Sequence, residues 1–578
     1  MATEVETPFG HSLPPEGAHT ITFHVPKWES AVKFREGDMS LVARLKSIYP
    51  RFMPFGPSAV LTKEIGAWIK TAPGRGLVGF LSPEVWRANQ DHAVSAEFRK
   101  EKAVAADELA YHAVEVGGVR LYLVEFPAAK TMGAIFMWQH GGLGFSTRLG
   151  EHLLSQMDSL EYLGEFSGDS ADAVPPPTYL PESEAHGLLR KRIAGLLARS
   201  TVQEYKKPVQ PEDVYLYQSG MAAILRCHEA IVRSRPYPVA VFGAVFHSSW
   251  HLFEESPGGL KHYGKCDEND LDEFEKYLEE GGKCSYVFTE FPSNPILVSV
   301  DLIRLRKLAD KYGFWIVVDE TLSSFCNIDV LPAADVVMSS LTKSFSGYAD
   351  LLAGSLALNP NSPASYAALK NDFAETYHNE FFEGDARQLF KNSDDYLARS
   401  AILNRNAATL AAYFQGLAED PAAPVRKVCY PPYSAGSSNL EPFRRRPSPE
   451  FPKPGYGCLF SVELASEAAT IAFYDNLAFH QGPHLGAHLT LAMPYNAMIY
   501  GKDKPEYHAA YGMDPNQIRF SVGLEDEAYL LGVCKRAVAA VVQEAGGLDG
   551  AQVTEKAMEQ ADGKASIDPL GGKPAASA

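Results

Sequence analysis

Lys343 has the clearest chemical potential in this sequence, because of where it lies. It follows an apolar, strand-like run, Ala334 to Met338, in the segment SSLTKSFSG, with Ser340 and Thr342 just before it. A lysine at such a strand end is partly desolvated, which favours the neutral amine that forms a Schiff base with an aldehyde. The two hydroxyl groups can donate hydrogen bonds to a phosphate. Lysine and phosphate donors together indicate pyridoxal phosphate (PLP), an aldehyde that carries a phosphate.

Two further polar residues close apolar, strand-like runs. Asp319 ends FWIVVD, where a carboxylate is costly unless it is paired, as it would be with a protonated pyridine nitrogen. That pairing keeps the PLP ring cationic and makes it an electron sink, whereas the competing interpretation of Asp319 is a turn or helix cap. Asn294, in EFPSNP, could reach the phenolic oxygen of the cofactor, although Asn-Pro is also an ordinary turn signal.

A strand-to-helix turn supplies a candidate phosphate site. The segment DVYLYQSG is typical of a strand and turn, and MAAILRCHEAIVRS of the helix that follows. The backbone N–H groups of Gly220 and Met221 at the helix start can cradle a phosphate, since a helix N-terminus carries partial positive charge. Small residues are common at such turns, so this signal depends on the other candidate residues.

The elements that must position these residues alternate regularly. The runs PVAVFGAVF, CSYVFTEFP, FWIVVDE and ADVVMSS are apolar without polar alternation, and helical patterns such as LIRLRKLADKYG separate them. This pattern predicts an α/β fold with a mostly parallel sheet that helices cover on both faces. Ligands of such sheets bind at the carboxyl ends of the strands, where the candidate residues fall.

Composition excludes several classes of protein. The chain has 578 residues, 46% hydrophobic and 21% charged, and a net charge of −18 with no long run of one sign, which argues against a nucleic-acid partner because phosphate binding needs a basic face. The seven cysteines form no CxxC pair, so we expect neither a disulfide framework nor a metal site. No run reaches the length of a membrane span, and the first residues lack the pattern of a signal or transit peptide. We therefore expect a cytoplasmic protein with no membrane or nucleic-acid partner.

Five regions are predicted along the chain. Residues 1–18 are expected to be disordered, and residues 19–177 to form an N-terminal extension domain of unknown role. Within it, TITFHVP and GAIFMWQH are predicted as strands and STRLGEHLLSQMDSLEYL as an amphipathic helix. Residues 178–400 are expected to form the PLP-binding α/β domain, residues 401–545 a C-terminal domain, and residues 546–578 a floppy tail.

Five motifs in order make the sequence resemble a known family. These are SGMAA, EFPSNP, VVDET, SLTKSFSG and RFSVGLED, and the resemblance covers roughly residues 178–540. Together they resemble the Cys/Met-metabolism family of PLP-dependent enzymes, most closely its fungal cystathionine γ-synthase branch. The segments TPFGHSLPP, SIYPRF and PPPTYLPESEAH also resemble that branch. The implied fold is the type I PLP-dependent (aspartate aminotransferase-like) fold, with a large α/β domain, a smaller C-terminal α+β domain and here an extra N-terminal domain.

The resemblance also implies roles for individual residues. Lys343 would bond to the PLP aldehyde, Asp319 would hold the pyridine nitrogen, and Gly220, Met221, Ser340 and Thr342 would bind the phosphate. Arg519, in RFSVGLED, would bind the substrate α-carboxylate, a task that suits a planar guanidinium. Family members place their active site at a dimer interface, so a homodimer or homotetramer is expected.

Three positions depart from the family pattern. The tyrosine that usually stacks on the cofactor is replaced by Phe246, which can stack but cannot move protons. An SLGG-like segment near the carboxylate site is here HLGA, beginning at His484. We hypothesise that His247 or His484 supplies the missing acid–base group. The usual Tyr-x-Arg phosphate contact, donated by a neighbouring subunit, is unclear at Tyr179, and Arg190 or Lys191 is considered as its replacement.

The expected function is a γ-replacement reaction. The resemblance implies that an O-acylhomoserine reacts with cysteine to give cystathionine, a transsulfuration step of methionine biosynthesis, with Lys343 as general base and acid. The motifs are shared with O-acetylhomoserine sulfhydrylases and C–S lyases, so sulfide, a carbon nucleophile or elimination without replacement remain alternatives. A non-catalytic PLP-binding scaffold is the remaining alternative, against which the intact Lys343, Asp319 and Arg519 argue.

Overall fold

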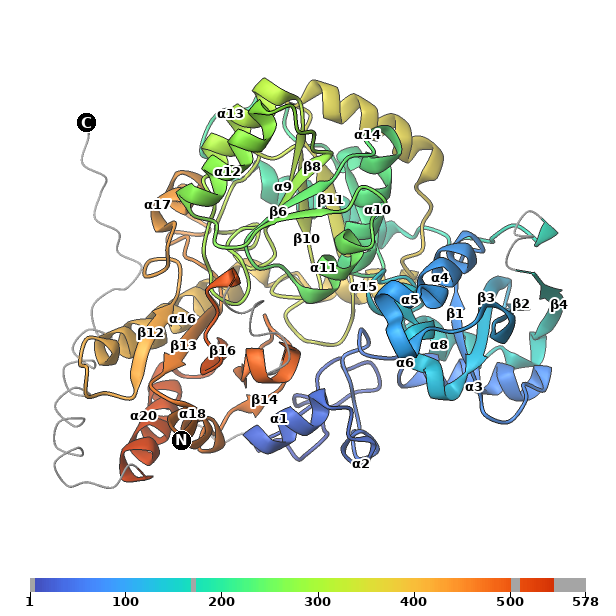
Figure 1. Ribbon diagram of the computed structural model, residues 1–578, viewed down its shortest axis with the longest axis horizontal. Helices are drawn as coiled ribbons and strands as arrows, with labels where there is room; N and C mark the ends of the chain where they lie inside the picture. Colours follow the sequence, from blue (N-terminus) through green and yellow to red (C-terminus); the bar gives the residue numbers. More distant parts are fainter. Residues whose placement is uncertain (1–5, 168–172, 501–509, 545–578) are drawn as a thin grey trace.

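The computed structural model describes residues 6–167, 173–500 and 510–544. Figure 1 shows three sheet-containing domains, with an N-terminal arm, residues 6–55, below and between them. The tail predicted for residues 546–578 and the first five residues of the predicted disordered N-terminus lie outside the described residues. In the described residues, no helix combines the length and the apolar character that crossing a membrane requires.

The central domain is built on a seven-stranded sheet in the order β5-β11-β10-β9-β8-β6-β7. Neighbours from β10 to β7 pair in parallel, whereas β11 is antiparallel to both β10 and β5, which confirms the mostly parallel sheet. The strands are β5 Val214–Tyr217, β6 Val239–Phe242, β7 Leu260–Tyr263, β8 Tyr286–Glu290, β9 Trp315–Asp319, β10 Val336–Ser339 and β11 Gly354–Leu358.

Helices cover both faces of this sheet, as the continuous apolar strands require. The face packed in one core carries α9 Glu184–Ala198, α12 Glu268–Glu279 and α13 Leu302–Tyr312. The opposite face carries α10 Gly220–Ser234, α11 His247–Glu254 and α14 Pro363–Thr376. Figure 1 shows α12 and α13 on one side of the sheet and α10 and α14 on the other. A 3₁₀ turn, Pro211–Asp213, leads into β5.

The C-terminal domain has a five-stranded sheet in the order β12-β13-β16-β15-β14. The helix predicted from Asp385 is interrupted after Asn392, and the predicted boundary at residue 400 falls inside α16. The strands are β12 Val425–Cys429, β13 Leu459–Leu464, β14 His480–Gln481, β15 Leu491–Met493 and β16 Gln517–Ser521. The helical segments are α15 Glu383–Asn392, α16 Tyr396–Ala418, α17 Ser437–Leu440, the 3₁₀ turn Glu441–Phe443, α18 Glu467–Asp475, the π turn Asn496–Tyr500 and α20 Glu527–Glu544.

The N-terminal domain is a separate antiparallel sheet in the order β1-β3-β2-β4. Helices α3 Pro57–Ile69 and α8 Thr147–Leu154 cover one face, and α4 Glu84–Val94, α6 Thr131–Ala134 and α7 Phe136–Gln139 cover the other. The strands are β1 Arg75–Phe80, β2 Ala110–Val116, β3 Val119–Pro127 and β4 Glu161–Phe166. The short elements are α5 Ala96–Arg99 and the 3₁₀ turns Lys100–Lys102, Ala106–Glu108, Ala128–Lys130 and Met157–Ser159.

Two strand predictions in the N-terminal region are wrong. GAIFMWQH forms helical turns, α6 and α7, because its apolar residues are buried on all sides and show no alternation that separates strand from helix. TITFHVP is extended but is not a strand of any sheet in the described residues. Ile21 N–H donates to Ala349 O, and Val25 N–H donates to Gln481 O of the edge strand β14. The helix predicted from Ser146 ends at Leu154, and β4 follows it.

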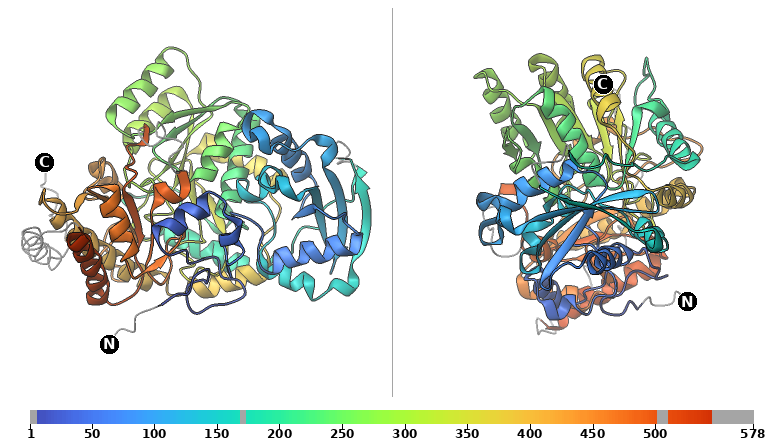
Figure 2. Two further views of the ribbon diagram at one scale, coloured as in Figure 1. Left: turned by 60° about the horizontal axis from the view of Figure 1, so that its bottom comes forward. Right: turned by 90° about the vertical axis from the view of Figure 1, so that its right-hand side faces the viewer.

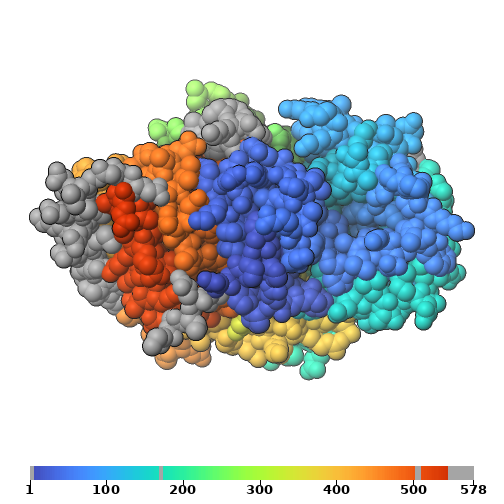
Figure 3. Space-filling view, turned by 90° about the horizontal axis from the view of Figure 1, so that it is seen from below, coloured from blue at the N-terminus to red at the C-terminus, as the bar shows by residue number. Residues whose placement is uncertain are grey.

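The N-terminal arm is ordered from residue 6, which corrects the prediction of a disordered segment to residue 18. Leu13 is only 2% exposed, and its N–H donates to Thr22 Oγ1 at 2.9 Å. The arm contains α1 Trp28–Arg35 and α2 Met39–Val42 and packs on the C-terminal domain rather than on the N-terminal sheet. Figure 3 shows the dark-blue arm between the orange C-terminal residues and the lighter-blue N-terminal domain. Residues 19–177 therefore do not form one folded unit.

Candidate active site

One cavity collects residues from the central sheet, the C-terminal domain and the arm. Ten of the eleven predicted site residues line it: Gly220, Met221, Phe246, His247, Asn294, Asp319, Ser340, Thr342, Lys343 and Arg519. Those of the central domain meet because the carboxyl ends of parallel strands lie at one edge of a sheet, and Arg519 reaches the cavity from the C-terminal sheet. The eleventh, His484, is buried behind the wall, and its neighbours Pro483 and Leu485 line the cavity.

Two acidic residues end neighbouring strands at this edge. Asp319 of β9 lies in register with Glu290 of β8. Asp319 accepts a hydrogen bond from Thr321 N–H at 2.9 Å, and its burial raises its pKa to about 6. Burial also raises the pKa of Glu290, and the nearby Asp319 adds to that shift. A buried carboxylate is costly unless it is paired, so a cationic group bound in this cavity would stabilise it.

Glu290 is a site residue that our reading of the sequence missed. Its carboxylate accepts hydrogen bonds from the backbone N–H groups of Phe246 at 2.5 Å and Asn294 at 3.2 Å. It therefore fixes the two loops that carry the predicted stacking residue and the predicted contact to the cofactor ring.

Lys343 is held at the start of a firmly anchored loop. Its Nζ donates to the hydroxyl of Tyr49 at 3.2 Å and lies 4.7 Å from the centre of that ring. Downstream, the buried Arg399 donates to the carbonyls of Ser344 at 3.0 Å and Phe345 at 3.2 Å. This anchoring keeps the position of the amine fixed within the cavity.

The start of α10 has the form of an anion cradle. Ser219 caps the helix, since its Oγ accepts from Ala222 N–H at 3.0 Å. A Cβ atom at Gly220 would lie 2.9 Å from Cβ and Oγ of Ser340, so this turn requires glycine. Both Gly220 and Ser340 line the cavity beside the positive end of a 15-residue helix. The Thr342 hydroxyl, in contrast, donates to Ala353 O at 3.1 Å and is committed to its own loop.

Arg519 of β16 brings a positive charge to the opposite wall. Its guanidinium donates to Asn294 Oδ1 at 3.2 Å and to the carbonyl of His484 at 3.2 Å, and it lies 4.9 Å from the ring centre of Tyr495. Within the described parts of the chain, no carboxylate lies within 4.0 Å of it, although it is 3% exposed. A buried, unpaired guanidinium suits a ligand carboxylate.

The two candidate histidines occupy different surroundings. His247 begins α11 and lines the cavity, and its ring centre lies 5.5 Å from that of His140 and 5.8 Å from that of His251. His484 is 1% exposed, with its ring 6.0 Å from Tyr49. Burial and the charges of Lys343 and Arg519 hold the pKa of His484 well below its usual value. These surroundings favour the neutral imidazole of His484 and argue against it as the acid–base group, which leaves His247 as the better candidate.

We expect His247→Gln to lower kcat by at least about tenfold, and His484→Gln to have a smaller effect. The reason is that only His247 lines the cavity, beside the phenylalanine that replaces the usual tyrosine. Steady-state kinetics of both single variants and the double variant measure this, with the exposed His152→Gln as the matched control. Unchanged turnover in the double variant would remove both histidines from the chemistry.

The arm contributes cavity residues that we did not predict. Tyr49 and Arg51 line the cavity, and Tyr49-Pro50-Arg51 has the Tyr-x-Arg spacing that we sought at Tyr179. Tyr179 instead stacks on His378, with ring centres 3.9 Å apart. The proposed replacements also lie elsewhere: Arg190 pairs with Glu182, and Lys191 is exposed on α9. The Tyr-x-Arg spacing is visible in the segment SIYPRF, but the sequence does not show where this segment lies in the fold.

The fold and the site together define the class of this protein. An aspartate ends β9 and a lysine follows the neighbouring strand β10 in a mostly parallel sheet, beside a helix start of the kind that suits an anion, and this arrangement is typical of a PLP-dependent enzyme of the type I fold. The chain belongs to the Cys/Met metabolism PLP-dependent enzyme family, because its residues 199–538 match the sequence profile of that family. In the described residues, no cluster of His, Cys, Asp or Glu is arranged to hold a metal ion.

Curated relatives match over almost the whole chain. Alanine racemase ungC of Aspergillus violaceofuscus is 32% identical over 89% of this chain and 94% of its own. The cystathionine gamma-synthase-like enzyme iboG2 of Amanita muscaria is 31% identical over 94% and 98%, and cystathionine gamma-synthase of Neurospora crassa is 29% identical over 92% and 97%. The crystal structure of cystathionine gamma synthase from Xanthomonas oryzae pv. oryzae has a TM-score of 0.51 at 23% identity, covering 63% of this chain and 87% of that chain. This last likeness supports the fold.

Proposed function

We propose that the chain catalyses γ-replacement on an O-acylhomoserine with cysteine, which gives cystathionine. The observation that carries the proposal is one cavity with the amine of Lys343 and the buried, unpaired guanidinium of Arg519. These two groups suit an α-amino acid, whose carboxylate would pair with Arg519 while its amino group approaches Lys343. The names of the Neurospora and Amanita relatives support the cystathionine γ-synthase type of reaction.

The residues of the cavity fit PLP, and each has a separate role in the proposed reaction. Bound PLP supplies an electron sink for the charge that develops at the substrate carbons. Asp319 would hold the pyridine nitrogen, and the start of α10 would hold the phosphate. Phe246 would stack on the ring. Lys343 would take the proton from Cα and move protons at Cβ, with the Tyr49 hydroxyl, 3.2 Å from its Nζ, placed to assist.

An assay of the purified protein with O-acetylhomoserine, with and without cysteine, tests this function. We expect cystathionine only when both compounds are present. Formation of 2-ketobutyrate and ammonia regardless of cysteine would show a lyase instead, and product only with sulfide would show a sulfhydrylase. Conversion of L-alanine to D-alanine, measured by chiral chromatography, would place the chain with its racemase relative and contradict γ-replacement.

Arg519→Lys is expected to raise the KM for the amino-acid substrate by about 10- to 100-fold, with a smaller change in kcat. The lysine keeps the charge but loses the planar fork, and a charge-assisted hydrogen bond contributes about 1.5–3 kcal/mol. Steady-state kinetics measure the change, and the visible spectrum of bound PLP should be retained. Arg426→Lys, at an exposed position of β12, is the matched control. An unchanged KM would show that the carboxylate binds elsewhere.

We also propose a cytoplasmic homodimer or homotetramer. Seven free cysteines, all buried, support a reducing compartment. Light scattering of the purified protein would give the oligomeric state.

A further inference from the structure

The N-terminal arm forms a wall of the active site rather than a peripheral extension. Its buried residues Ile21, Phe23 and Tyr49 pack in one apolar cluster with Met493 and Tyr495 of the C-terminal domain. Figure 2 shows the arm, in dark blue, between the C-terminal domain and the N-terminal domain. The arm therefore brings Tyr49 and Arg51 into a cavity whose lysine lies 294 positions further along the chain than Tyr49.

The N-terminal domain holds this part of the arm through the segment at α7. Trp138 Nε1–H donates to Pro50 O at 2.7 Å, and Gln139 Nε2–H donates to Phe52 O at 2.5 Å. Arg51 donates in return to Trp138 O, and its guanidinium carbon lies 5.5 Å from the centre of the Trp138 ring. Both side chains of the domain are buried, Trp138 at 2% and Gln139 at 7% exposure. Three hydrogen bonds thus fix the backbone and side chain around Arg51.

The same segment continues onto the anion cradle. Ser219 Oγ–H donates to Gly142 O at 2.8 Å. Gly142 has a φ of +69°, and a Cβ there would lie 2.5 Å from Met221 Cβ and 2.6 Å from Ala222 N. Residues of the N-terminal domain therefore touch both the Tyr49-Pro50-Arg51 segment and the helix start that faces the cavity.

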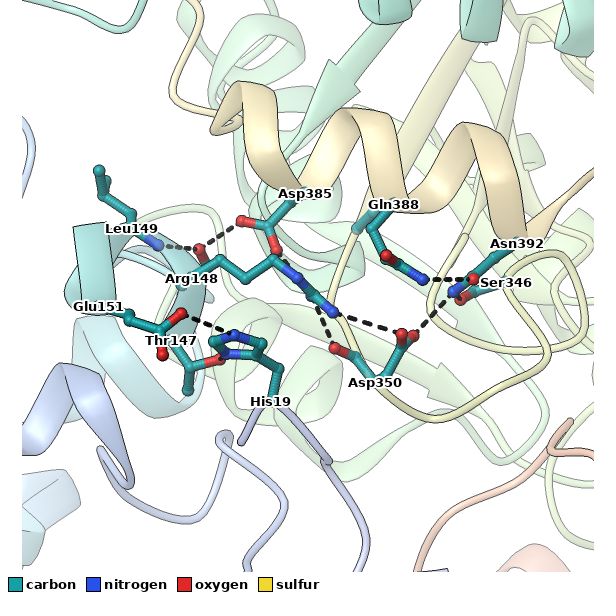
Figure 4. Close-up of polar contacts among 12 residues, drawn as sticks. His19, Thr147, Arg148, Leu149, Glu151, Ser346, Asp350, Asp385, Gln388 and Asn392 are labelled. Atoms are coloured by element: carbon teal, nitrogen blue, oxygen red, sulfur yellow. Dashed lines mark hydrogen bonds and ion pairs between the residues drawn. The ribbon is translucent and has the colours of Figure 1, made fainter. Parts of the chain in front are cut away.

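Helix α8 provides a second link between arm, N-terminal domain and catalytic loop (Figure 4). His19 of the arm lies 3.0 Å from Thr147 Oγ1 and 3.2 Å from Glu151 Oε2. Arg148 of the same helix donates to Asp350 O at 2.8 Å and to Asp385 Oδ1 at 3.1 Å. Because Asp350 lies on the loop that begins at Lys343, α8 ties the N-terminal domain to the catalytic loop and to α15.

We propose that the N-terminal domain is a brace that holds the Tyr49-Pro50-Arg51 segment in the cofactor cavity of its own chain, with Trp138 and Gln139 as positioning residues. This inference rests on the proposed PLP chemistry of the cavity. The buried Arg51 has no carboxylate partner in the described residues, so an anion in the cavity, such as the cofactor phosphate, would compensate its charge. In the structure the Tyr-x-Arg segment lies in the cavity of its own chain, whereas the family resemblance implies a contact from a neighbouring subunit.

Cofactor titration of the apoprotein, followed by visible absorbance, tests the brace. We expect Trp138→Phe, which removes the donor to Pro50 O, to weaken PLP binding by about tenfold. When Arg51→Ala is already present, Trp138→Phe should change the affinity for PLP by less than about twofold, because Trp138 affects the cofactor through the arm. Trp68→Phe, at a 51% exposed position of the same domain, is the matched control. Gln139→Leu repeats the cycle should Trp138→Phe fold poorly. Additive effects of Trp138→Phe and Arg51→Ala on PLP affinity would overturn the proposal. So would an unchanged PLP affinity in both Trp138→Phe and Gln139→Leu.

Cross-linking tests whether the arm stays within its own chain. Lys27 Nζ donates to Asp475 O at 2.5 Å, and Trp28 N–H donates to Asp475 Oδ1 at 2.8 Å. The thiols of a Lys27→Cys, Asp475→Cys double variant should therefore lie within reach of a short bismaleimide. The seven native cysteines are buried and should not react. We expect a linked single chain on a denaturing gel, whereas a covalent dimer would show exchange between subunits. Neither test depends on the substrate, so a failure of γ-replacement would leave both readouts valid.

Discussion

Replacing Lys343 with alanine is expected to lower kcat by about 10⁴-fold or more, the largest effect of any single substitution in this chain. The amine is the basic group placed in the cavity to take a proton from a substrate carbon, and it lies within 3.2 Å of the Tyr49 hydroxyl. Its loop is held independently by Arg399, which bonds to the carbonyls of Ser344 and Phe345, so the fold should survive the change.

Three comparisons separate lost chemistry from lost structure in this variant. Lys276→Ala, an exposed lysine on α12, should leave turnover unchanged. Methylamine added to Lys343→Ala should restore part of the rate, since a small amine can fill the space of the lost one. Lys343→Arg keeps the charge but supplies no neutral amine, and it should be as inactive as Lys343→Ala. Turnover above about a tenth of the wild-type rate in Lys343→Ala would remove the lysine from the chemistry.

The central domain could be predicted from the sequence because its signals are local. Strands such as Trp315–Asp319 are short, continuously apolar and separated by amphipathic helices, and this pattern has few structural solutions. Once the sheet is parallel, residues that close different strands must meet at one edge, which is why Asp319 and Lys343 share a cavity. The strand prediction for GAIFMWQH is wrong because the residues of this segment are buried on every side. Its hydrophobic pattern therefore shows neither the period of a strand nor that of a helix.

The missed part of the site depends on contacts between distant segments. Tyr49 reaches Lys343 across 294 positions of sequence, and the helix α7, whose Trp138 donates to the carbonyl of the adjacent Pro50, belongs to a third region. The Tyr-x-Arg spacing is visible in SIYPRF, yet no local pattern says which surface that segment covers. The protonation state of His484 could not be predicted either, because its low pKa results from burial and from the charges of Lys343 and Arg519.

Asp319→Asn is expected to lower kcat by about 10³-fold and to weaken PLP binding. A neutral amide cannot pair with a protonated pyridine nitrogen, so the ring would lose the charge that makes it an effective electron sink. Kinetics and a cofactor titration measure both changes. Asp310→Asn, which alters an exposed carboxylate on α13 that pairs with Arg306, is the matched control and should change neither. A variant that keeps more than a tenth of wild-type kcat would contradict the assigned role.

The same substitution should have the opposite effect on the stability of the apoprotein. Burial raises the pKa of Asp319 from 3.8 to about 6, so the folded state binds its proton more tightly than the unfolded state does. The contribution of this carboxyl to stability is therefore present below pH 3.8 and is lost as the pH rises through about 6. Asparagine never ionises, so at pH 8 the free energy of unfolding of the Asp319→Asn apoprotein should exceed that of the wild type by on the order of 3 kcal/mol. Urea unfolding at pH 8 and pH 4 measures this difference, which should shrink towards zero at the lower pH. If Asp319→Asn stabilises the apoprotein and lowers activity, the charge of Asp319 serves to bind the cofactor and does not stabilise the fold.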